Sequence, residues 1–523
     1  MIRLAKAADI RRMDSLAISS CGFSEEKLMD NAALALNGRM DLFLASKGRE
    51  YGKTVILCGA GNNGGDGYAL AERFISAGRD FDIIAVYPPK SDEAVRRALH
   101  IKSLGKTVYS AEHDTAECKS LVIGADTVVD AIFGVGYNSD RTADNVFYRV
   151  VRWLRQSNAL IISVDMPSGV SSDDAGFYEE SSEHFPVCIK ADATVTFQMS
   201  KVGLESAPGI FYAGEVFTED IFIPEKVLEE IPFSARLGDI GVLDCIPQRR
   251  TDSNKGSYGR LVSFCGSRNM PGAAVLSCLG ALSGGVGLMT CLVTDSVKRV
   301  VASCVPEVIF QTLPELNEGV IDVNSCESII NGSLSRATGL LIGCGIGTDR
   351  SARRLILELI DSSQCPIVLD ADGINLLCDD IDVFKKHGRR MVLTPHPGEM
   401  ARLLKTDVSG IQKNRVTSAD FFSGEFGSVV VLKGYRTVVS SPDKGIYINP
   451  TGNPGMAKAG TGDVLAGLTA GLVAQRIDPF EAAACAAYVH GLAGDMASDE
   501  MGEISMRASD LVRYIPQVFA SKR

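Results

Sequence analysis

Short apolar runs alternate with amphipathic segments of helical length along most of the chain. In the first half the apolar runs are residues 54–60, 81–87, 125–134, 159–169 and 193–198. Amphipathic segments such as residues 91–105 separate them, and two helices are expected earlier, at residues 6–18 and 24–46, the second beginning at Ser24. Strands that alternate with helices predict a doubly wound parallel sheet, so the fold class is α/β.

The same alternation returns in the second half, at residues 258–267, 340–348, 365–373, 389–399 and 428–435. Between about residues 225 and 257 it lapses into a polar stretch. A chain of 523 residues exceeds what one hydrophobic core normally supports. We therefore expect two fused α/β domains, residues 1–225 and 251–523, joined by a linker region at 226–250.

The composition excludes several classes of partner. The net charge is −11, with 64 acidic and 53 basic side chains and no basic run, which argues against nucleic acid. The 14 cysteines lie singly in apolar runs without a C-x-x-C pair, which is typical of a reducing compartment. The charged N-terminus does not resemble a signal peptide, so a cytoplasmic location is expected. A homo-oligomer is expected as well.

One segment is long enough to cross a membrane, because no charge falls between Arg268 and Asp295. It contains Pro271 and several glycines, however. We therefore predict a small-residue helix packed on a sheet, followed by a turn and a strand at residues 288–294, and no membrane partner.

Residues 59–67, GAGNNGGDG, follow the first strand and precede a helix. Gly59, Gly61 and Gly64 satisfy the dinucleotide fingerprint G-x-G-x-x-G. The next strand lacks the acidic residue that would hold a ribose and ends at Tyr87 before two prolines. Two amides and an aspartate stand inside the loop instead, so an ordinary dinucleotide cofactor is not expected there.

Two further aspartates of the first half, Asp130 and Asp165, end strands beside glycine-rich loops. Each could merely cap a loop, but two of them on neighbouring strands favour a site. Lys201 could contact an acid or a phosphate, or be an ordinary solvated lysine.

In the second half, Gly460, Thr461, Gly462 and Asp463 form a glycine turn that opens into an apolar helix. Such a turn offers free N–H groups that stabilise an anion. Asp463 could then act as a base on a hydroxyl group, or simply cap the helix.

Two other motifs follow strands in this half. LKGYRT, residues 432–437, places Lys433 and Arg436 where a nucleotide could bind. TPHPGE holds His396 between two prolines, where the ring could act in the site or fill a gap.

Six segments of the second half occur together and in order: KGSYGRLVSFCGS, NMPGAA, IGCGIG, TPHPGE, LKGYRT and NPTGNPGMAKAGTGD. They resemble the ribokinase-like superfamily and, within it, the ADP- or ATP-dependent NAD(P)H-hydrate dehydratases, over residues 250–523. In the first half GNNGGDG, VVDAIFGVG and VDMPSGV are similar to the NAD(P)H-hydrate epimerases, over about residues 1–225. The resemblance thus implies a Rossmann-like epimerase domain fused to a ribokinase-like dehydratase domain.

The resemblance also implies the reactions. The first domain would interconvert the R and S forms of hydrated NADH and NADPH, called NADHX and NADPHX. The second would dehydrate the S form at the expense of ADP, with ATP possible, and release AMP and phosphate. A potassium ion and a magnesium ion are the implied metals.

By resemblance, roles pass to individual residues. Asp463 and Asp165 are the catalytic carboxylates, and Gly460, Thr461 and Gly462 form the anion hole. Asn63, Asp130 and Ser168 would hold potassium. The epimerase substrate would contact Asn62, Asn63, Gly64, Gly65, Asp66, Gly134, Val135, Gly136, Tyr137, Asn138, Ser139, Asp140 and Asp165. The dehydratase substrate would contact Ala273, Gly345, His396 and Asp463, and the nucleotide Lys433, Gly434, Tyr435, Arg436, Thr437 and Gly462.

Two alternatives stay open from the sequence. A small-molecule kinase, for example one for a vitamin precursor, shares the G-T-G-D turn but releases a stable phosphate ester. The first domain could instead be a binding or scaffold module, for which Asn63, Asp130, Asp165 and Ser168 would be unnecessary.

Overall fold

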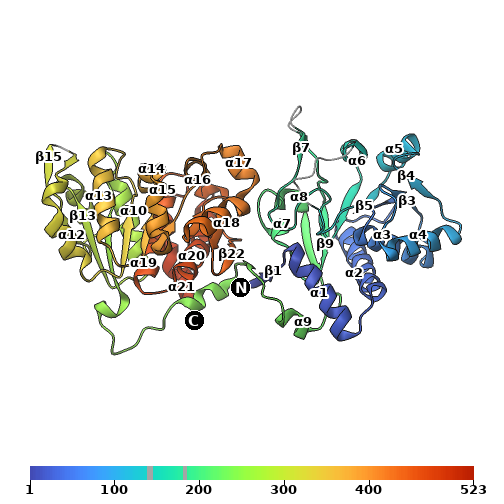
Figure 1. The fold of residues 1–523 in the computed structure, drawn as a ribbon, viewed down its shortest axis with the longest axis horizontal. Coiled ribbons are helices and arrows are strands. Elements are labelled where there is room, and N and C mark those ends of the chain that lie inside the picture. The colour runs from blue at the N-terminus through green and yellow to red at the C-terminus, as the bar shows by residue number, and fades with distance from the viewer. Residues whose placement is uncertain (138–144, 181–184, 318, 523) are drawn as a thin grey trace. The chain divides into compact units, whose positions relative to one another are not determined.

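The computed structural model describes residues 1–137, 145–180, 185–317 and 319–522. The chain divides into two compact units, residues 3–235 and residues 236–523, the second of which also includes Met1 and Ile2 (Figure 1). This boundary falls inside the stretch that the sequence suggested as a linker region.

The N-terminal unit is built from a sheet of seven parallel strands and the helices between them. Its elements, with β1 at the boundary, are β1 (Ile2–Leu4), α1 (Ala7–Cys21), α2 (Glu25–Ser46), β2 (Thr54–Cys58), α3 (Asn62–Ser76), β3 (Phe81–Ala85), α4 (Asp92–Ser103), β4 (Val108–Ser110), α5 (Thr115–Ile123), β5 (Thr127–Ala131), α6 (Asn145–Leu154), β6 (Leu160–Val164), β7 (Glu179–Glu180), β8 (Phe185–Pro186), β9 (Ala193–Phe197), α7 (Val202–Glu205), α8 (Ile210–Ala213), β10 (Glu215–Glu219) and α9 (Glu225–Glu229).

The sheet of this unit has the strand order β10-β9-β6-β5-β2-β3-β4, with every neighbouring pair parallel. From the central strands β2 and β5 the chain winds outward in opposite directions, which makes this a doubly wound sheet. Side chains alternate along β2, because Ile56 packs with α1–α4 on one face and Val55 and Leu57 pack with α5 and α6 on the other. The expected α/β fold of the first half is confirmed.

Both helices predicted near the N-terminus are present as α1 and α2. Ser24 is the N-cap residue of α2, since its side chain accepts a hydrogen bond from the Lys27 N–H (3.1 Å). The strands β4 and β10 at the two edges were not singled out from the sequence. They are short or partly exposed, so their apolar signal is weak.

The C-terminal unit contains a larger sheet with helices on both faces. Its elements are β11 (Ala235–Leu237), η1 (Ile240–Cys245), η2 (Lys255–Tyr258), β12 (Arg260–Phe264), α10 (Pro271–Ser283), β13 (Leu288–Val293), α11 (Asp295–Cys304), β14 (Ile309–Thr312), β15 (Glu315–Asn317), β16 (Val320–Ile321), η3 (Val323–Ser325), α12 (Glu327–Leu334), β17 (Gly339–Ile342), α13 (Arg350–Ser362), β18 (Ile367–Leu369), α14 (Asp372–Leu377), α15 (Ile381–His387), η4 (Gly388–Arg390), β19 (Met391–Leu393), α16 (Pro397–Leu404), α17 (Val408–Lys413), α18 (Arg415–Phe426), β20 (Val429–Leu432), β21 (Val438–Ser441), β22 (Gly445–Ile448), η5 (Pro454–Met456), α19 (Thr461–Ala474), α20 (Pro479–Met501) and α21 (Ala508–Ala520).

The strand order from the β14 edge is β14-β13-β12-β17-β18-β19-β20-β21-β22, followed by β11 and β1. The strands from β14 to β20 are parallel, and β21 and β22 are antiparallel additions. Val439 of β21 belongs to the core formed with α10, α11 and α19–α21. On the opposite face Ser440 donates a hydrogen bond to Asp420 of α18 (3.0 Å), so this sheet is also covered on both sides.

The uncharged stretch from Arg268 to Asp295 forms the small-residue helix α10 and, after a turn, the strand β13, as expected. Among the described residues, no helix is long and apolar enough to cross a membrane. The helices α10 and α19 pack so closely that a Cβ added to Gly467 would lie 2.0 Å from the Ser277 carbonyl oxygen. Backbone contact between these helices therefore fixes the position of α19, the helix that carries Asp463.

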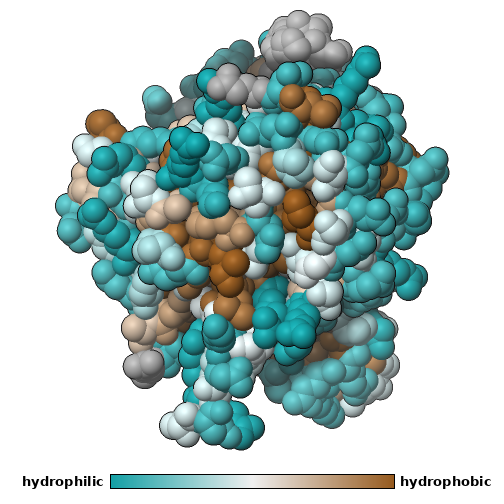
Figure 2. Space-filling model, turned by 90° about the vertical axis from the view of Figure 1, so that its left-hand side faces the viewer, coloured by the Kyte–Doolittle hydropathy of each residue, from teal (hydrophilic) through white to brown (hydrophobic). Residues whose placement is uncertain are grey.

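Apolar side chains are scattered over the surface of the C-terminal unit. On the face shown in Figure 2, hydrophobic side chains gather in a few brown areas between larger hydrophilic ones. Ile309, Leu316 and Val320 are examples of exposed apolar residues in the C-terminal unit. Such scattered exposure is ordinary for a protein surface.

The first prediction tests the contact between α10 and α19. Gly467→Ala should destabilise the C-terminal unit by about 1–3 kcal/mol, because the added methyl group meets backbone that cannot move aside cheaply. Gly272→Ala is the matched control, since no atom lies within 4 Å of a Cβ added there. Urea unfolding followed by circular dichroism measures both, and equal stability of the two variants would contradict the packing described.

Candidate active sites

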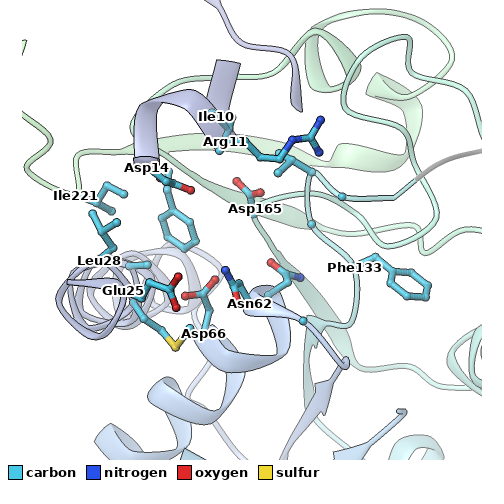
Figure 3. A pocket seen from close by; sticks show the side chains of 18 of the residues that line it. Ile10, Arg11, Asp14, Glu25, Leu28, Asn62, Asp66, Phe133, Asp165 and Ile221 are labelled. Atoms are coloured by element: carbon cyan, nitrogen blue, oxygen red, sulfur yellow. The ribbon is translucent and has the colours of Figure 1, made fainter. Parts of the chain in front are cut away.

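A cavity of about 450 Å³ lies in the N-terminal unit, beside the carboxyl ends of β2 and β5 (Figure 3). These are the two strands from which the chain winds in opposite directions, and ligands of open α/β sheets bind at that point. Helices α1 and α2 complete its walls. It is lined by Ile10, Arg11, Met13, Asp14, Ile18, Glu25, Leu28, Met29, Ala32, Ala60, Gly61, Asn62, Asn63, Asp66, Ile132, Phe133, Gly134, Val135, Gly136, Tyr137, Asp165, Phe197, Lys201 and Ile221.

The NNGGD segment is the first turn of α3 and not a loop, with Gly61 as the N-cap residue. Its amides and Asp66 line the cavity, but two of its glycines serve packing. A Cβ on Gly64 would lie 2.0 Å from the Gly59 carbonyl oxygen, and one on Gly65 would lie 2.4 Å from Met29 Cε. These glycines therefore let α3 approach the turn after β2 and the helix α2.

A buried ion pair joins Asp165 to Lys201 at the cavity wall. The Lys201 side chain is 1% exposed, and its Nζ donates to Asp165 Oδ1 (2.6 Å), to Thr196 Oγ1 (2.6 Å) and to the Phe197 carbonyl (3.1 Å). Asp165 has a φ of 66°, a left-handed conformation that is uncommon outside glycine. Lys201 therefore contacts an acid, which is one of the possibilities left open by the sequence. The alternative that it is an ordinary solvated lysine is wrong.

Three further carboxylates face the same cavity, namely Asp14, Glu25 and Asp66 (Figure 3). Burial, and then the charge of Asp165, raises the pKa of Asp14 to about 6. The same two causes, with the charge of Asp14 added, raise the pKa of Asp66 well above its usual range. The cavity therefore combines one ion-paired carboxylate with two carboxyl groups, those of Asp14 and Asp66, whose pKa values are raised.

A second buried carboxylate, Asp130, lies at the end of β5 behind the cavity. Its Oδ1 accepts from Ser168 Oγ (2.5 Å) and the Ile132 N–H (3.3 Å), and its Oδ2 accepts from Ser163 Oγ (2.8 Å) and the Ser168 N–H (2.8 Å). Burial raises the pKa of Asp130, and these hydrogen bonds lower it in part. This network ties the ends of β5 and β6 together.

In the C-terminal unit the ends of β17, β18 and β20 meet the start of α19. Ligand atoms of Cys344, Asp370 and Asp463 lie within 4.8 Å of one another. Asp370 is almost completely buried and accepts from Lys433 Nζ (2.8 Å) and Thr394 Oγ1 (2.7 Å). Asp370 and Lys433 thus form a second buried ion pair at strand ends.

Asp463 stands next to this pair, in the first turn of α19. Burial, and then the charge of Asp370, raises its pKa to about 7, although Lys433 acts to lower it. Gly460, with a φ of 92°, is the N-cap residue of this helix, so Asp463 is not its cap. A carboxylate with such a pKa, placed at the positive end of a helix, can exchange a proton near neutral pH.

Charge and backbone N–H groups converge at the same turn. A Cβ built on Gly462 would lie 3.4 Å from Lys433 Nζ, which places the ammonium beside the turn. His490 is buried behind it and donates from Nε2 to the Thr461 carbonyl (2.9 Å), while burial lowers the pKa of His490 to about 4. The turn is therefore held by a neutral histidine and faces a fixed positive charge.

A family model described as NAD(P)H-hydrate dehydratase matches residues 261–517, and one described as YjeF-related protein N-terminus matches residues 25–203. The bifunctional NAD(P)H-hydrate repair enzyme of Moorella thermoacetica is 35% identical over 98% of this chain and 96% of its own length. That of Thermofilum pendens is 33% identical over 100% and 97%. The chain belongs to the family of bifunctional NAD(P)H-hydrate repair enzymes.

Two solved structures are similar to about half of the chain. An ADP/ATP-dependent NAD(P)H-hydrate dehydratase from Bacillus subtilis is 29% identical and covers 54% of this chain and 96% of its own, with a TM-score of 0.46. A ribokinase-like superfamily protein from Enterococcus faecalis is 27% identical and covers 55% and 96%, with a TM-score of 0.49. The resemblance to the repair-enzyme family found in the sequence motifs is confirmed by the full-length relatives.

Most of the residues implied by the repair-enzyme motifs lie either at the cavity of the N-terminal unit or near the start of α19 in the C-terminal unit. A Cβ on Gly345, which has a φ of 63°, would lie 2.6 Å from Ala273 Cβ, so these two expected substrate contacts are adjacent. His396 is the N-cap residue of α16, with Nδ1 accepting from the N–H groups of Gly398 (2.9 Å) and Glu399 (3.3 Å). This capping role explains why its ring is fixed. The expected contacts Asn138, Ser139 and Asp140 lie outside the described residues.

The LKGYRT segment of the repair-enzyme motifs forms a turn between β20 and β21. Thr437 Oγ1 donates to the Gly434 carbonyl (2.9 Å), Arg436 has a φ of 54°, and Tyr435 is 54% exposed. Beneath it the buried Arg415 donates to the Leu432 (3.0 Å) and Lys433 (3.2 Å) carbonyls, and burial lowers the pKa of Arg415 to about 10. The cation thereby holds the end of β20.

Several residues of these sites were missed in the sequence. Asp14 and Glu25 lie on helices whose polar residues look like an ordinary solvated face. Asp370 was seen only as a strand end, and Arg415 stands in an unremarkable helix. Of these residues, only Asp370 could have been found from the sequence. It directly follows the apolar run PIVL, as Asp130 and Asp165 follow apolar runs, and this position predicts a carboxylate at a strand end.

The second prediction concerns the ion pair of Asp165. Lys201→Met should destabilise the N-terminal unit by about 3 kcal/mol or more, because it leaves a buried carboxylate without its cation. Lys47→Met is the control, since the Lys47–Glu215 pair is exposed and should contribute less than about 1 kcal/mol. Trp153, the only tryptophan of the chain, is buried in this unit, so urea unfolding followed by its fluorescence reports the unit selectively. Equal stability of the two variants would contradict this account.

Proposed function

We propose that the chain repairs hydrated NADH and NADPH, with epimerisation in the N-terminal unit and dehydration in the C-terminal unit. The observation that carries the proposal is the second site, where a carboxylate with a pKa of about 7 adjoins a lysine and a helix N-terminus. Full-length relatives bear the name of this activity.

In the C-terminal unit Asp463 removes the proton from the ring hydroxyl of the S form. The hydroxyl oxygen attacks the terminal phosphorus of the nucleotide, and AMP leaves when the donor is ADP. The N–H groups of residues 460–462 and the Lys433 ammonium stabilise the charge on the phosphoryl group. Departure of phosphate with loss of the neighbouring C–H proton then restores the ring double bond.

The nucleotide is assigned to the turn of residues 433–437 and to Gly462, and ADP is favoured over ATP. The cluster of Cys344, Asp370 and Asp463 does not fit a protein-held magnesium ion. A thiol is a poor ligand for Mg²⁺, and Lys433 already occupies Asp370. A magnesium ion would therefore arrive on the nucleotide phosphates.

In the N-terminal unit the cavity takes the hydrated ring, with Asp165 in contact with it. The carboxylates of the cavity repel phosphate, so the pyrophosphate belongs at the mouth, where Gly61 and Asn62 begin α3 with free N–H groups. This orientation puts the epimeric carbon among the proton-transfer groups.

Potassium fits the groups at the end of β5. Asn63 offers an amide oxygen, and Asp130 and Ser168 add a carboxylate and a hydroxyl oxygen. Neutral oxygens with one carboxylate suit a large monovalent cation, in the manner of other oxygen-liganded sites. We assign Asn63, Asp130 and Ser168 to hold the ion, which would supply positive charge beside the substrate.

A cytoplasmic location, a homo-oligomeric state and the absence of nucleic-acid and membrane partners stay predictions. The kinase alternative is separated by its product, since a kinase would accumulate a phosphate ester where the repair enzyme releases inorganic phosphate together with NADH.

The third prediction tests Asp463 as the base. Asp463→Asn should lower dehydratase turnover by about a hundredfold to ten-thousandfold, with epimerisation and thermal stability unchanged. In the wild type, turnover should rise as the pH increases through about 7, where the carboxyl group ionises. Asp478→Asn is the control, because Asp478 caps α20 and Asn caps equally well. Normal turnover in Asp463→Asn, measured by the return of NADH absorbance, would require another base.

The fourth prediction tests the potassium site. Ser168→Ala should raise the potassium concentration needed for half-maximal epimerisation and weaken the rise of the melting temperature with KCl. Ser163→Ala removes a hydroxyl that also donates to Asp130 but is not an assigned ligand, so it should keep the wild-type potassium response. Epimerisation that is independent of potassium in the wild type would refute the site.

A further inference from the structure

The helix α1 brings Asp14 into the epimerase cavity from a different element than Asp165. The helix is fixed at its start, where Asp9 accepts from the Lys6 N–H (2.9 Å) and Asp173 accepts from the Ala7 N–H (2.6 Å). Met13, next to Asp14, is buried in the core. Figure 3 shows the carboxylates of Asp14 and Asp165 both directed at the cavity. The position of Asp14 is therefore set by packing.

Asp14 has no hydrogen bond or ion pair in the described part of the chain, unlike Asp165 with its lysine. The charged groups that face it are Asp165, Lys201 and Glu25, and Asp66 and Arg11 line the same cavity. Burial and the charge of Asp165 raise the pKa of Asp14 to about 6. Asp165 is ion-paired with Lys201, whereas Asp14 makes no such contact among the described residues. Different surroundings of this kind can divide the roles of acid and base between two neighbouring carboxyl groups.

Epimerisation of a hydrated nicotinamide needs such a pair. Water adds to the enamine double bond with its hydroxyl on the carbon next to the ring nitrogen, which makes that carbon a hemiaminal. The hydroxyl groups of the R and S forms project from opposite faces of the ring. A proton must therefore be removed on one face and delivered on the other.

We propose that Asp14 is the second catalytic residue of the epimerase, acting on the ring face opposite Asp165. In one direction Asp165 takes the hydroxyl proton, the C–O bond becomes C=O, and the carbon–nitrogen bond breaks with its electron pair on the nitrogen. That charge spreads through the ring double bond into the carboxamide. The aldehyde carbon rotates, the nitrogen closes on its other face, and the new alkoxide takes the proton of Asp14.

The protons balance in each turnover. After each turnover Asp165 carries the proton and Asp14 is ionised. Proton exchange with water, or conversion in the opposite direction, restores the starting state before the next turnover. Ring opening is preferred here to loss of hydroxide, because a ring cation could lose its neighbouring proton and dehydrate without a nucleotide. The inference rests on the proposed function of the N-terminal unit.

The experiment uses the full-length chain with the purified S form of hydrated NADH and no nucleotide, so that dehydration does not run. Formation of the R form is followed by chromatography. Asp14→Asn should lower kcat by about a hundredfold or more and leave KM within about threefold, because the amide keeps the size and polarity of the carboxyl group. Asp14→Glu should recover part of the activity.

Two control variants separate catalysis from general effects. Arg12→Gln changes an exposed residue of α1, and Glu25→Gln removes another carboxylate of the cavity. Arg12→Gln should epimerise within about threefold of the wild type. Glu25→Gln, which changes the charge of the cavity without removing a proposed proton-transfer group, should lose much less activity than Asp14→Asn. Dehydratase turnover with nucleotide and Trp153 fluorescence should be unchanged in Asp14→Asn.

The outcomes separate a failure of the proposed epimerase function from a failure of the proposed role of Asp14. A wild type that leaves the S form unchanged would refute the proposed epimerase function, and the role of Asp14 with it. A wild type that epimerises while Asp14→Asn does so equally well would overturn the role of Asp14 alone. Equal losses in Asp14→Asn and Glu25→Gln would also overturn it, because cavity charge would then account for the effect.

Discussion

A lysine–carboxylate pair buried at the ends of parallel strands is the interaction on which both sites depend. Each pair sets an ammonium group against one carboxylate where water is scarce. Burial, and then the charge of that paired carboxylate, raises the pKa of a second carboxyl group beside it. The two proposed tasks, proton transfer to and from the ring hydroxyl during epimerisation and deprotonation of that hydroxyl before phosphoryl transfer, thus rest on the same electrostatic arrangement. The pairs are Asp165–Lys201 and Asp370–Lys433, and the neighbouring carboxyl groups are Asp14 and Asp463.

The sheets explain why these groups meet. All strands that carry them run parallel, so their carboxyl ends share one edge, and loops at that edge can hold charged side chains without disturbing the core. Helices beside the strand ends supply the remaining groups of each site. In the N-terminal unit α1 delivers a carboxyl group, and in the C-terminal unit α19 delivers both a carboxyl group and the N–H groups of its first turn.

The parts of the fold and of the candidate sites that could be predicted are those that produce a recognisable pattern within a few consecutive residues. Buried strands are recognisable as apolar runs, and glycine turns such as residues 460–462 mark the edge of the sheet where the candidate site lies. Edge elements such as β10, and the antiparallel pair β21 and β22, were missed because their apolar residues are few or mixed with polar ones. Asp14 and Lys201 could not be assigned for a different reason. Their roles come from which helix or strand packs beside which, and no local pattern encodes that choice.

The winding of the two sheets has a consequence for how the chain folds. The central strand pairs join distant segments, with Thr54 opposite Thr127 in one unit and Leu261 opposite Gly339 in the other. Such pairings carry a large loop-closure entropy and slow the search for the native state. The loops after these strands also form the walls of the sites. A folding intermediate with only local helices and hairpins would therefore have neither site, because each site needs these non-local strand pairings.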